Sequence, residues 1–234
     1  MQPSILCDED LLDMLDDLLR EPKPFWESFY EDRTKKIPFF QVKGPDENLV
    51  DYFDRGFEPR KALDLGCGPG RNAIYMAKKG CQVDAIDISE KAIEWVNERA
   101  MEEDVEINLY CDSVFNFEFE EQSYDFIYDS GLFHHLAPHR RLTYIKILKK
   151  ALKKDGKFGL VCFNTDGALP TPDWQVYKER SLKGGIGYTE KRLRQVFEQD
   201  FTFIECRKMK NITQPSEQFG FEFLWTALME KKGI

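Results

Sequence analysis

Residues 62–70 read A-L-D-L-G-C-G-P-G, and this stretch decides the fold class. Its first four residues form the apolar end of a short strand, and three glycines follow at alternate positions, Gly66, Gly68 and Gly70. A helical pattern starts at Arg71. Glycine permits positive φ angles and the close approach of a ligand, and a helix N-terminus offers unpaired N–H groups and a partial positive charge. The stretch therefore predicts the strand, turn and helix of a doubly wound sheet that binds a ligand at the turn.

The spacing of the glycines distinguishes two classes of cofactor. A dinucleotide motif reads G-x-G-x-x-G, whereas this chain has G-x-G-x-G with Asp64 two residues before the first glycine. A buried acid at that place would repel a pyrophosphate and suits a cofactor with an ammonium group. The pattern resembles the first motif, D/E-x-G-x-G-x-G, of the class I S-adenosylmethionine (SAM)-dependent methyltransferases. The resemblance assigns these residues to cofactor binding: Asp64, Gly66, Cys67, Gly68, Gly70 and Asn72.

Two further predicted strands end in acids, in the order that this resemblance requires. The second strand ends at Asp87, 17 residues after the last glycine of the motif. That distance is close to the roughly 20 residues expected before an acid that binds ribose hydroxyls. Ile88 would then pack on one face of the adenine. The third strand ends at Asp112, and the resemblance places Asp112 and Ser113 beside the adenine amino group.

The fourth predicted strand, residues 123–129, leads into S-G-L-F-H-H-L. Y-D-F-I-Y followed by H-H-L looks like the fourth-strand motif of many small-molecule methyltransferases, which implies cofactor contacts for Asp129 and Ser130. We predict His134 and His135 as the catalytic pair, with one of them acting as a base or orienting the substrate. The alternative is that they shape the loop through hydrogen bonds to the backbone. Adjacent histidines cannot easily face one metal ion, so no metal site is expected.

The order of predicted elements gives a doubly wound α/β fold, with a seven-stranded, mostly parallel sheet and helices on both faces. The resemblance implies the strand order 3-2-1-4-5-7-6 with strand 7 antiparallel, in one methyltransferase domain at residues 46–234. The fifth strand is expected at 156–164, after a tight turn at Asp155-Gly156. A basic helix precedes it, and we expect the Lys and Arg side chains of that helix to form a solvated face.

Residues 1–45 precede the sheet and are predicted to form a helical lid. They contain an amphipathic helix at 8–20 and an aromatic segment at 25–30. Trp26-x-x-x-Tyr30 followed by P-F-F resembles, more loosely, the N-terminal lid of small thiol, halide and tellurite methyltransferases. A second variable region, residues 164–187, is also expected to face the substrate. The predicted substrate wall, whose members could otherwise be ordinary core aromatics, consists of Trp26, Phe29, Phe39, Phe40, Trp174 and Tyr177.

The composition argues against several other classes of protein. The net charge is −9 and the pI is about 5.0, whereas nucleic-acid binders usually carry a basic patch. No stretch has the roughly 18 consecutive apolar residues of a membrane span, and the first residues do not resemble a secretory signal. Six scattered cysteines form no C-x-x-C pair, as in a reduced cytosolic protein. We therefore expect a cytoplasmic monomer or homodimer without nucleic-acid or membrane partners.

These patterns predict an enzyme that transfers a methyl group from SAM to a small-molecule acceptor by in-line displacement, leaving S-adenosylhomocysteine (SAH). Two alternatives remain open: a methyltransferase that acts on RNA or protein, and a SAM-binding protein without catalysis, since a fold does not fix a function. Residues 129–132 read D-S-G-L rather than an N-P-P-Y-type tetrad, which weakens transfer to the exocyclic amines of bases. The sequence does not identify the acceptor.

Overall fold

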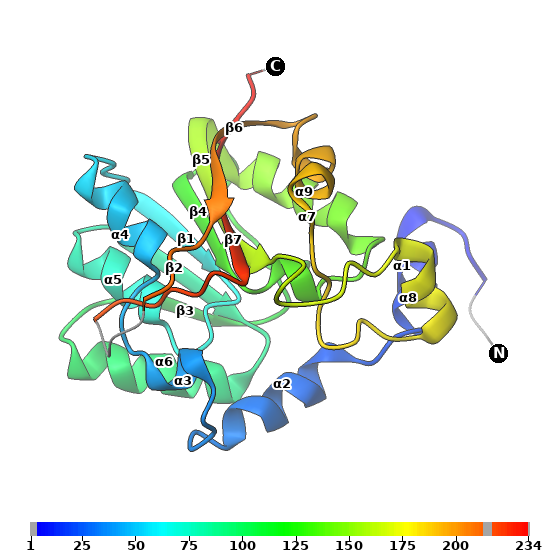
Figure 1. Ribbon diagram of the computed structural model, residues 1–234, viewed down its shortest axis with the longest axis horizontal. Coiled ribbons are helices and arrows are strands. Elements are labelled where there is room, and N and C mark those ends of the chain that lie inside the picture. Colours follow the sequence, from blue (N-terminus) through cyan, green and yellow to red (C-terminus); the bar gives the residue numbers. More distant parts are fainter. Residues whose placement is uncertain (1–3, 213–216, 234) are drawn as a thin grey trace.

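A computed structural model describes residues 4–212 and 217–233 of the chain, and it contains a seven-stranded sheet flanked by helices (Figure 1). The strands are β1 (Lys61–Leu65), β2 (Gln82–Asp87), β3 (Asn108–Cys111), β4 (Tyr124–Ser130), β5 (Leu152–Phe163), β6 (Phe201–Lys208) and β7 (Leu224–Lys231). The helices are α1 (Asp8–Asp16), α2 (Pro22–Glu31), α3 (Pro38–Gln41), α4 (Glu47–Asp54), α5 (Arg71–Lys78), α6 (Glu90–Glu102), the 3-10 helix η1 (Phe133–His135), α7 (Arg140–Ala151), α8 (Asp173–Glu179) and α9 (Glu190–Phe197).

The strand order of the sheet is β3-β2-β1-β4-β5-β7-β6. The first five strands pair in parallel, and β7 is antiparallel to both of its neighbours, β5 and β6. The order and the reversed strand confirm the predicted fold class. The chain changes direction across the sheet between β1 and β4, and in open sheets of this kind ligands bind beyond the carboxyl ends of the strands at that point.

The start of β5 differs from the prediction. The strand begins at Leu152, so Asp155 and Gly156 lie inside it rather than before it. Asp155 takes a positive φ of 61°, and the register of β5 with β4 shifts between Tyr124 and Phe126. The predicted separate turn is therefore wrong: these residues form a local irregularity within a longer strand.

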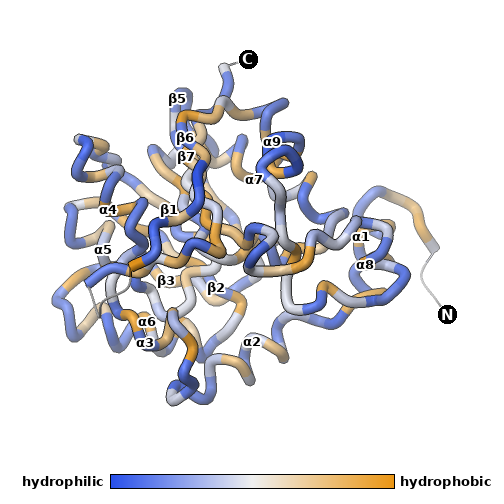
Figure 2. The backbone as a smooth tube through the Cα atoms, viewed as in Figure 1, coloured by the Kyte–Doolittle hydropathy of each residue, from blue (hydrophilic) through white to orange (hydrophobic). Residues whose placement is uncertain are grey.

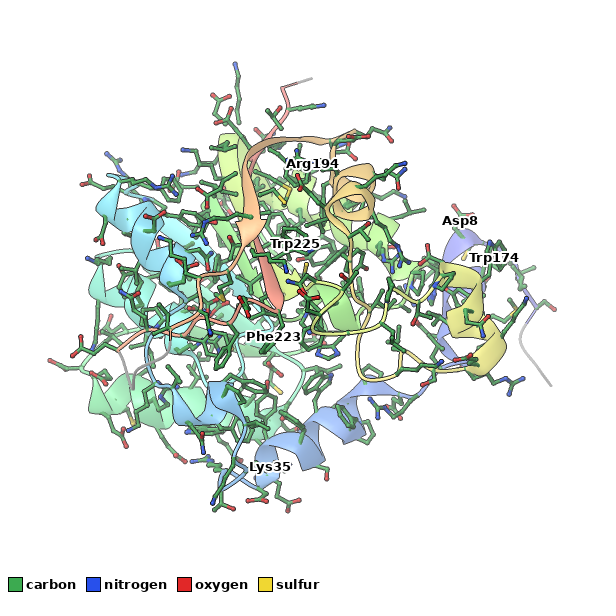
Figure 3. The ribbon with its side chains drawn as sticks, viewed as in Figure 1. Asp8, Lys35, Trp174, Arg194, Phe223 and Trp225 are labelled. Carbon is green, nitrogen blue, oxygen red and sulfur yellow. The ribbon has the colours of Figure 1, made fainter. Side chains whose placement is uncertain are left out.

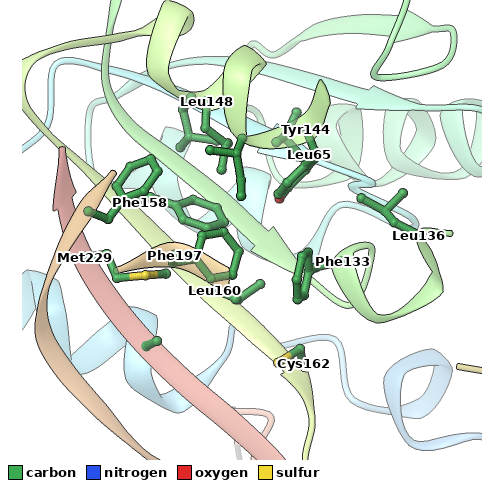
Figure 4. Close-up of a cluster of buried hydrophobic side chains, with 14 of the residues drawn as sticks. Leu65, Phe133, Leu136, Tyr144, Leu148, Phe158, Leu160, Cys162, Phe197 and Met229 are labelled. Atoms are coloured by element: carbon green, nitrogen blue, oxygen red, sulfur yellow. The ribbon is translucent and has the colours of Figure 1, made fainter. Parts of the chain in front are cut away.

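The sheet separates two hydrophobic cores. Leu63 and Leu65 of β1 belong to the core covered by α7 and α9, and Ala62 belongs to the core covered by α4, α5 and α6. Figure 4 shows the first core, where the rings of Phe158 and Phe197 lie 5.7 Å apart. Along α4, α5 and α6 the tube alternates between polar and apolar colours (Figure 2), as expected for amphipathic helices on a sheet. Apolar burial on both faces thus fixes the strand ends that carry the site.

The basic helix α7 is only partly a solvated face. Arg140 and Arg141 are buried at its N-terminal end, whereas Leu142 is 69% exposed. Arg140 pairs with three carboxylates of α1, and Arg141 donates to Asp173 of α8. The prediction of a uniformly solvated basic face is therefore wrong at these two arginines, because α1 and α8 pack against this end of α7.

The N-terminal helices lie outside the sheet. α1 and α8 form one end of the molecule, where Asp8 and Trp174 are labelled together in Figure 3, and α2 runs from there toward α6 (Figure 1). No residue of α1 is buried. In the described ranges, no helix is long and apolar enough to cross a membrane.

Candidate cofactor and substrate site

A cavity of about 1160 Å³ lies at the carboxyl ends of the parallel strands, against α2. Its wall combines the glycine loop after β1, the residues that follow β2, β3 and β4, parts of the N-terminal segment and residues of the stretch 219–224. The volume exceeds the roughly 300–1,000 Å³ that is typical of a pocket for one small ligand. The cavity therefore has room for a cofactor and a second molecule together.

The glycine loop is shaped for close approach. Gly66 and Gly68 line the cavity and take positive φ angles of 66° and 51°. A Cβ atom on Gly68 would lie 2.8 Å from the hydroxyl oxygen of Tyr30, which packs on this loop from α2. Gly70 is needed for packing instead, because a Cβ atom there would lie 2.1 Å from Cγ2 of Val96 on α6. Two of the three motif glycines thus form the cavity wall, and the third holds the loop against α6.

Asp87 lies at the end of β2, where the sequence predicts the ribose acid. Its Oδ2 accepts the Gly68 N–H and its Oδ1 accepts the Ser89 N–H, each at 2.9 Å. Burial raises the pKa of Asp87 to about 6. The carboxylate is thus held in place by two backbone donors on the cavity wall. Five other predicted cofactor residues also line the cavity: Cys67, Ile88, Asp112, Ser113 and Ser130.

Two of the predicted cofactor acids lie behind the cavity wall. Asp64 is 2% exposed beneath the glycine loop, and burial raises its pKa to about 8. Asp129 is fully buried; it accepts the N–H groups of Leu132 and Phe133 and the hydroxyl of Tyr144. Burial raises the pKa of Asp129 to about 7. Asp129 therefore fixes the start of η1, and neither acid forms part of the cavity wall.

Arg71 lines the cavity in place of its predicted neighbour Asn72. Arg71 donates from Nε and Nη2 to Oδ1 of Asp46, at 3.1 and 2.7 Å, and from Nη2 to Oγ of Ser130 at 3.0 Å. Asn72 is buried and also pairs with Asp46. Nη1 of Arg71 has no hydrogen bond to the described residues, so it is free to pair with an anionic group in the cavity. The only sequence signal for this role is a cation directly after the glycine motif.

The two adjacent histidines line the cavity in different states. Nδ1 of His134 accepts the Phe163 N–H at 3.2 Å, so its proton is on Nε2, and burial lowers its pKa well below the usual value. His135 packs edge-on against Trp26, with ring centroids 4.9 Å apart, and burial lowers its pKa to about 4. The His135 ring has no hydrogen bond to the described residues. Both rings are therefore neutral at pH 7, and no cluster of three metal ligands occurs in the described ranges.

The predicted aromatic wall is only partly the observed one. Trp26 and Phe39 line the cavity, and Phe29 and Phe40 pack against them from the side away from it. Five aromatic residues of the wall are not in the predicted set, and of these only Tyr30 belongs to a motif quoted from the sequence: Tyr30, Phe115, Phe163, Phe219 and Phe223. Phe223 is labelled near the centre of Figure 3.

The predicted residues of α8 do not reach the cavity. Trp174 is 81% exposed, and the hydroxyl of Tyr177 bonds to His139 at 2.8 Å. Their region, residues 164–187, contributes residues 180–184 to the wall instead. Residues 180–184 thus lie on the cavity wall, whereas Trp174 and Tyr177 do not, and the predicted contact of this region with a substrate stays a prediction.

The chain is similar to known proteins over the part that carries this site. A model of the family described as a methyltransferase domain matches residues 62–156, which include the glycine loop, Asp87 and both histidines. An uncharacterized methyltransferase of Schizosaccharomyces pombe is 30% identical over 120 residues, covering 51% of this chain and 83% of the relative. The chain therefore belongs to the class I SAM-dependent methyltransferases.

Two particular proteins are also similar to this chain. TehB of Haemophilus influenzae, described as a probable SAM-dependent methyltransferase, is 30% identical over 164 residues, covering 69% of this chain and 53% of TehB. The chain thus spans about half the length of that relative. The solved structure of 1,6-didemethyltoxoflavin-N1-methyltransferase from Burkholderia thailandensis aligns with 99% of this chain and 93% of that protein's chain. The TM-score is 0.63 and the sequence identity is 18%. This second likeness concerns the fold.

The cavity wall fits SAM, the cofactor of this class. Asp87 presents a fixed carboxylate for the ribose, and Gly68 leaves a cradle that a Cβ atom would fill. The free Nη1 of Arg71 suits the carboxylate of the methionine part. Asp64 lies outside the wall, so its predicted contact with the ammonium group has no direct path. Arg71 thus offers a partner for the carboxylate of SAM, whereas the acid predicted for its ammonium group lies behind the wall.

Proposed function

We propose that this chain transfers the methyl group of SAM to a small molecule whose acceptor group is acidic, such as a thiol or a phenol. One observation carries the proposal: a single cavity joins the cofactor residue Asp87 to the neutral ring of His135 and the aromatic ring of Trp26. An aromatic wall suits a small molecule. The Burkholderia protein, whose fold is shared, holds 1,6-didemethyltoxoflavin together with SAH.

When bound, SAM would supply a methyl group whose carbon the nucleophilic atom of the acceptor attacks in line, so that the bond to sulfur breaks, SAH leaves and the proton of the acceptor passes to water. The residues of the chain hold the acceptor and exclude water. His135 is neutral and accepts a hydrogen bond from the acceptor, and His134 presents Nε2–H as a donor. With a pKa of about 4, His135 is too weak a base to deprotonate an alcohol at pH 7. A thiol or a phenol needs no stronger base, which sets the proposed acceptor class.

In this proposal residues 1–45 form the lid and residues 46–234 the catalytic domain. Trp26 and Tyr30 of α2 lie over His135 and Gly68, where they exclude water from the reacting atoms. All six cysteines are free thiols, which favours a reducing compartment such as the cytosol.

The test is SAH formation with SAM and a panel of small thiols, phenols, alcohols and amines. We expect turnover with thiols or phenols and none with alcohols. In His135→Phe, which keeps a ring against Trp26, kcat/KM falls about 3- to 10-fold, as for one lost neutral hydrogen bond. A loss of about 100-fold or more would assign general-base catalysis to His135 and contradict the proposed role.

Tyr177→Phe is the matched control, because it removes a hydroxyl outside the cavity and is expected to keep full turnover. Tight binding of SAM without SAH formation on any acceptor would instead support the non-catalytic SAM-binding protein. Turnover confined to RNA or protein substrates would contradict the small-molecule acceptor.

A further inference from the structure

Helix α2 contacts both the cavity and α6 along one stripe of its surface. Trp26 and Tyr30, four residues apart, line the cavity. Lys23 and Glu27, also four residues apart, contact the start of α6. Residues three and four apart are neighbours on a helix surface, so the two pairs lie side by side. One short stretch of α2 therefore touches the cavity and α6 at the same time.

Glu27 completes the N-terminus of α6. Its Oε1 accepts the N–H of Glu90 at 2.7 Å, and its Oε2 accepts the N–H of Lys91 at 3.2 Å and the hydroxyl of Ser89 at 3.0 Å. The first N–H groups of a helix have no partner within the helix. The helix's own cap, Oγ of Ser89, satisfies only the N–H of Ala92. A carboxylate from α2, more than sixty residues away in sequence, therefore pairs with two donors that α6 cannot satisfy itself.

The same cap leads directly to the cofactor acid. The N–H of Ser89 donates to Oδ1 of Asp87, and the N–H of Gly68 donates to Oδ2. Gly68 in turn packs against the hydroxyl of Tyr30 on α2. The contacts form a closed ring that runs from Glu27 through Ser89, Asp87 and Gly68 to Tyr30. Displacement of α2 would thus loosen both residues, Ser89 and Gly68, whose N–H groups donate to the two oxygens of Asp87.

We propose that Glu27 is a positioning residue for the cofactor: by capping α6 from the lid it fixes Ser89, and through Ser89 it fixes the carboxylate of Asp87. The inference rests on the proposed function only in that Asp87 binds the ribose of SAM. In this proposal the contact of Glu27 with α6 both holds the lid in place and supports the affinity for the cofactor. Lid docking at the far end of α6, where Arg33 pairs with Glu98, carries no such link.

The test compares Glu27→Ala and Glu27→Gln with two matched variants. Arg33→Gln loosens α2 from α6 away from the cap, and Glu31→Gln removes the same charge from the same helix at an exposed position. We measure SAH affinity by calorimetry and amide exchange at Glu90, Lys91 and Gly68 by mass spectrometry. We expect about a 10-fold weaker affinity for SAH in Glu27→Ala, with a smaller loss in Glu27→Gln, which keeps one acceptor oxygen.

Exchange is expected to rise at α6 and also at Gly68 in the Glu27 variants, and only near Glu98 in Arg33→Gln. Equal SAH affinity in Glu27→Ala and Arg33→Gln, with faster exchange confined to the first turn of α6, would reduce Glu27 to a structural cap and overturn the proposal. Thermal melts show whether each variant is folded, and Glu27→Asp serves as the charge-retaining rescue. A failure of the proposed function leaves these binding differences in place, because none of them requires turnover.

Discussion

One arginine supplies three of the polar contacts that hold α1 against the rest of the molecule, and His139 adds a hydrogen bond to Asp16. Arg140 is buried and pairs with Glu9, Asp13 and Asp16 at N–O distances of 2.6, 2.8 and 2.6 Å. Those carboxylates are 61%, 67% and 45% exposed, so solvent screens each pair. At about 0.5 kcal/mol a pair, the three together contribute about 1.5 kcal/mol. That is about a tenfold change in the equilibrium between attached and detached α1.

Arg140→Gln is therefore expected to increase the detached fraction of α1 about tenfold. A nine-residue helix is not stable by itself in water, so detachment exposes its amides. Hydrogen exchange over residues 8–16 measures this fraction directly. In the wild type, exchange also rises as salt is raised to 1 M, where the screening length falls to about 3 Å, whereas the variant responds little.

Arg194→Gln is the control for this prediction, because Arg194 pairs with Glu190 of its own helix α9. It changes the net charge equally and is expected to leave α1 unaffected. Equal exchange of α1 in the wild type and in Arg140→Gln would show that the ion pairs of Arg140 do not hold α1 in place. Exchange in the wild type that does not respond to salt would show the same.

Three further predictions concern Asp87 on the cavity wall and Gly70 and Asp64 behind it. SAH affinity is expected to fall as the pH drops below about 6, where Asp87 gains a proton, and Asp87→Asn removes this pH dependence; calorimetry at several pH values decides. Gly70→Ala, with φ +75° and a Cβ atom 2.1 Å from Val96, is expected to lower the free energy of unfolding by about 2–4 kcal/mol, and Val96→Ala added to it recovers part. If urea melts show no loss of unfolding free energy in Gly70→Ala, then contact with Val96 does not require glycine at this position. The neutral form of Asp64 is favoured in the folded state, since burial raises its pKa from 3.8 to about 8. The stability it contributes is therefore complete below about pH 4 and is lost as the pH rises to about 8. Asp64→Asn is expected to show a shallower decline across that window in denaturant melts, and an unchanged slope would contradict the shift.

The sequence predicts the parts of the site that local backbone geometry dictates. Gly66 and Gly68 lie on the cavity wall and Asp87 lies at the end of β2, because a strand, a tight turn and a helix must follow one another in that order. Ile88 and Asp112 follow for the same reason, at the ends of neighbouring parallel strands. Whether these residues bind SAM as predicted is tested by the SAH measurements above.

Tertiary contacts decide the rest of the wall, and no spacing reveals them. Asn72 and Asp129 carry the expected side chains at the expected positions, yet one pairs with Asp46 and the other caps η1. The neighbouring Arg71 reaches the cavity because Asp46 orients two of its nitrogens. Phe219 joins the wall from a stretch that precedes the last strand and carries no motif.

The position of β7 has a consequence for biosynthesis. It follows all the other strands in the chain, yet it pairs between β5 and β6. Until it inserts, the nascent chain exposes the open edge of β5, and exposed edges invite association with other chains. The stretch that closes the far wall of the cavity directly precedes β7. The cavity is therefore complete only after this stretch has been made, and a pause in translation before it would prolong the period in which aggregation competes with completion of the sheet.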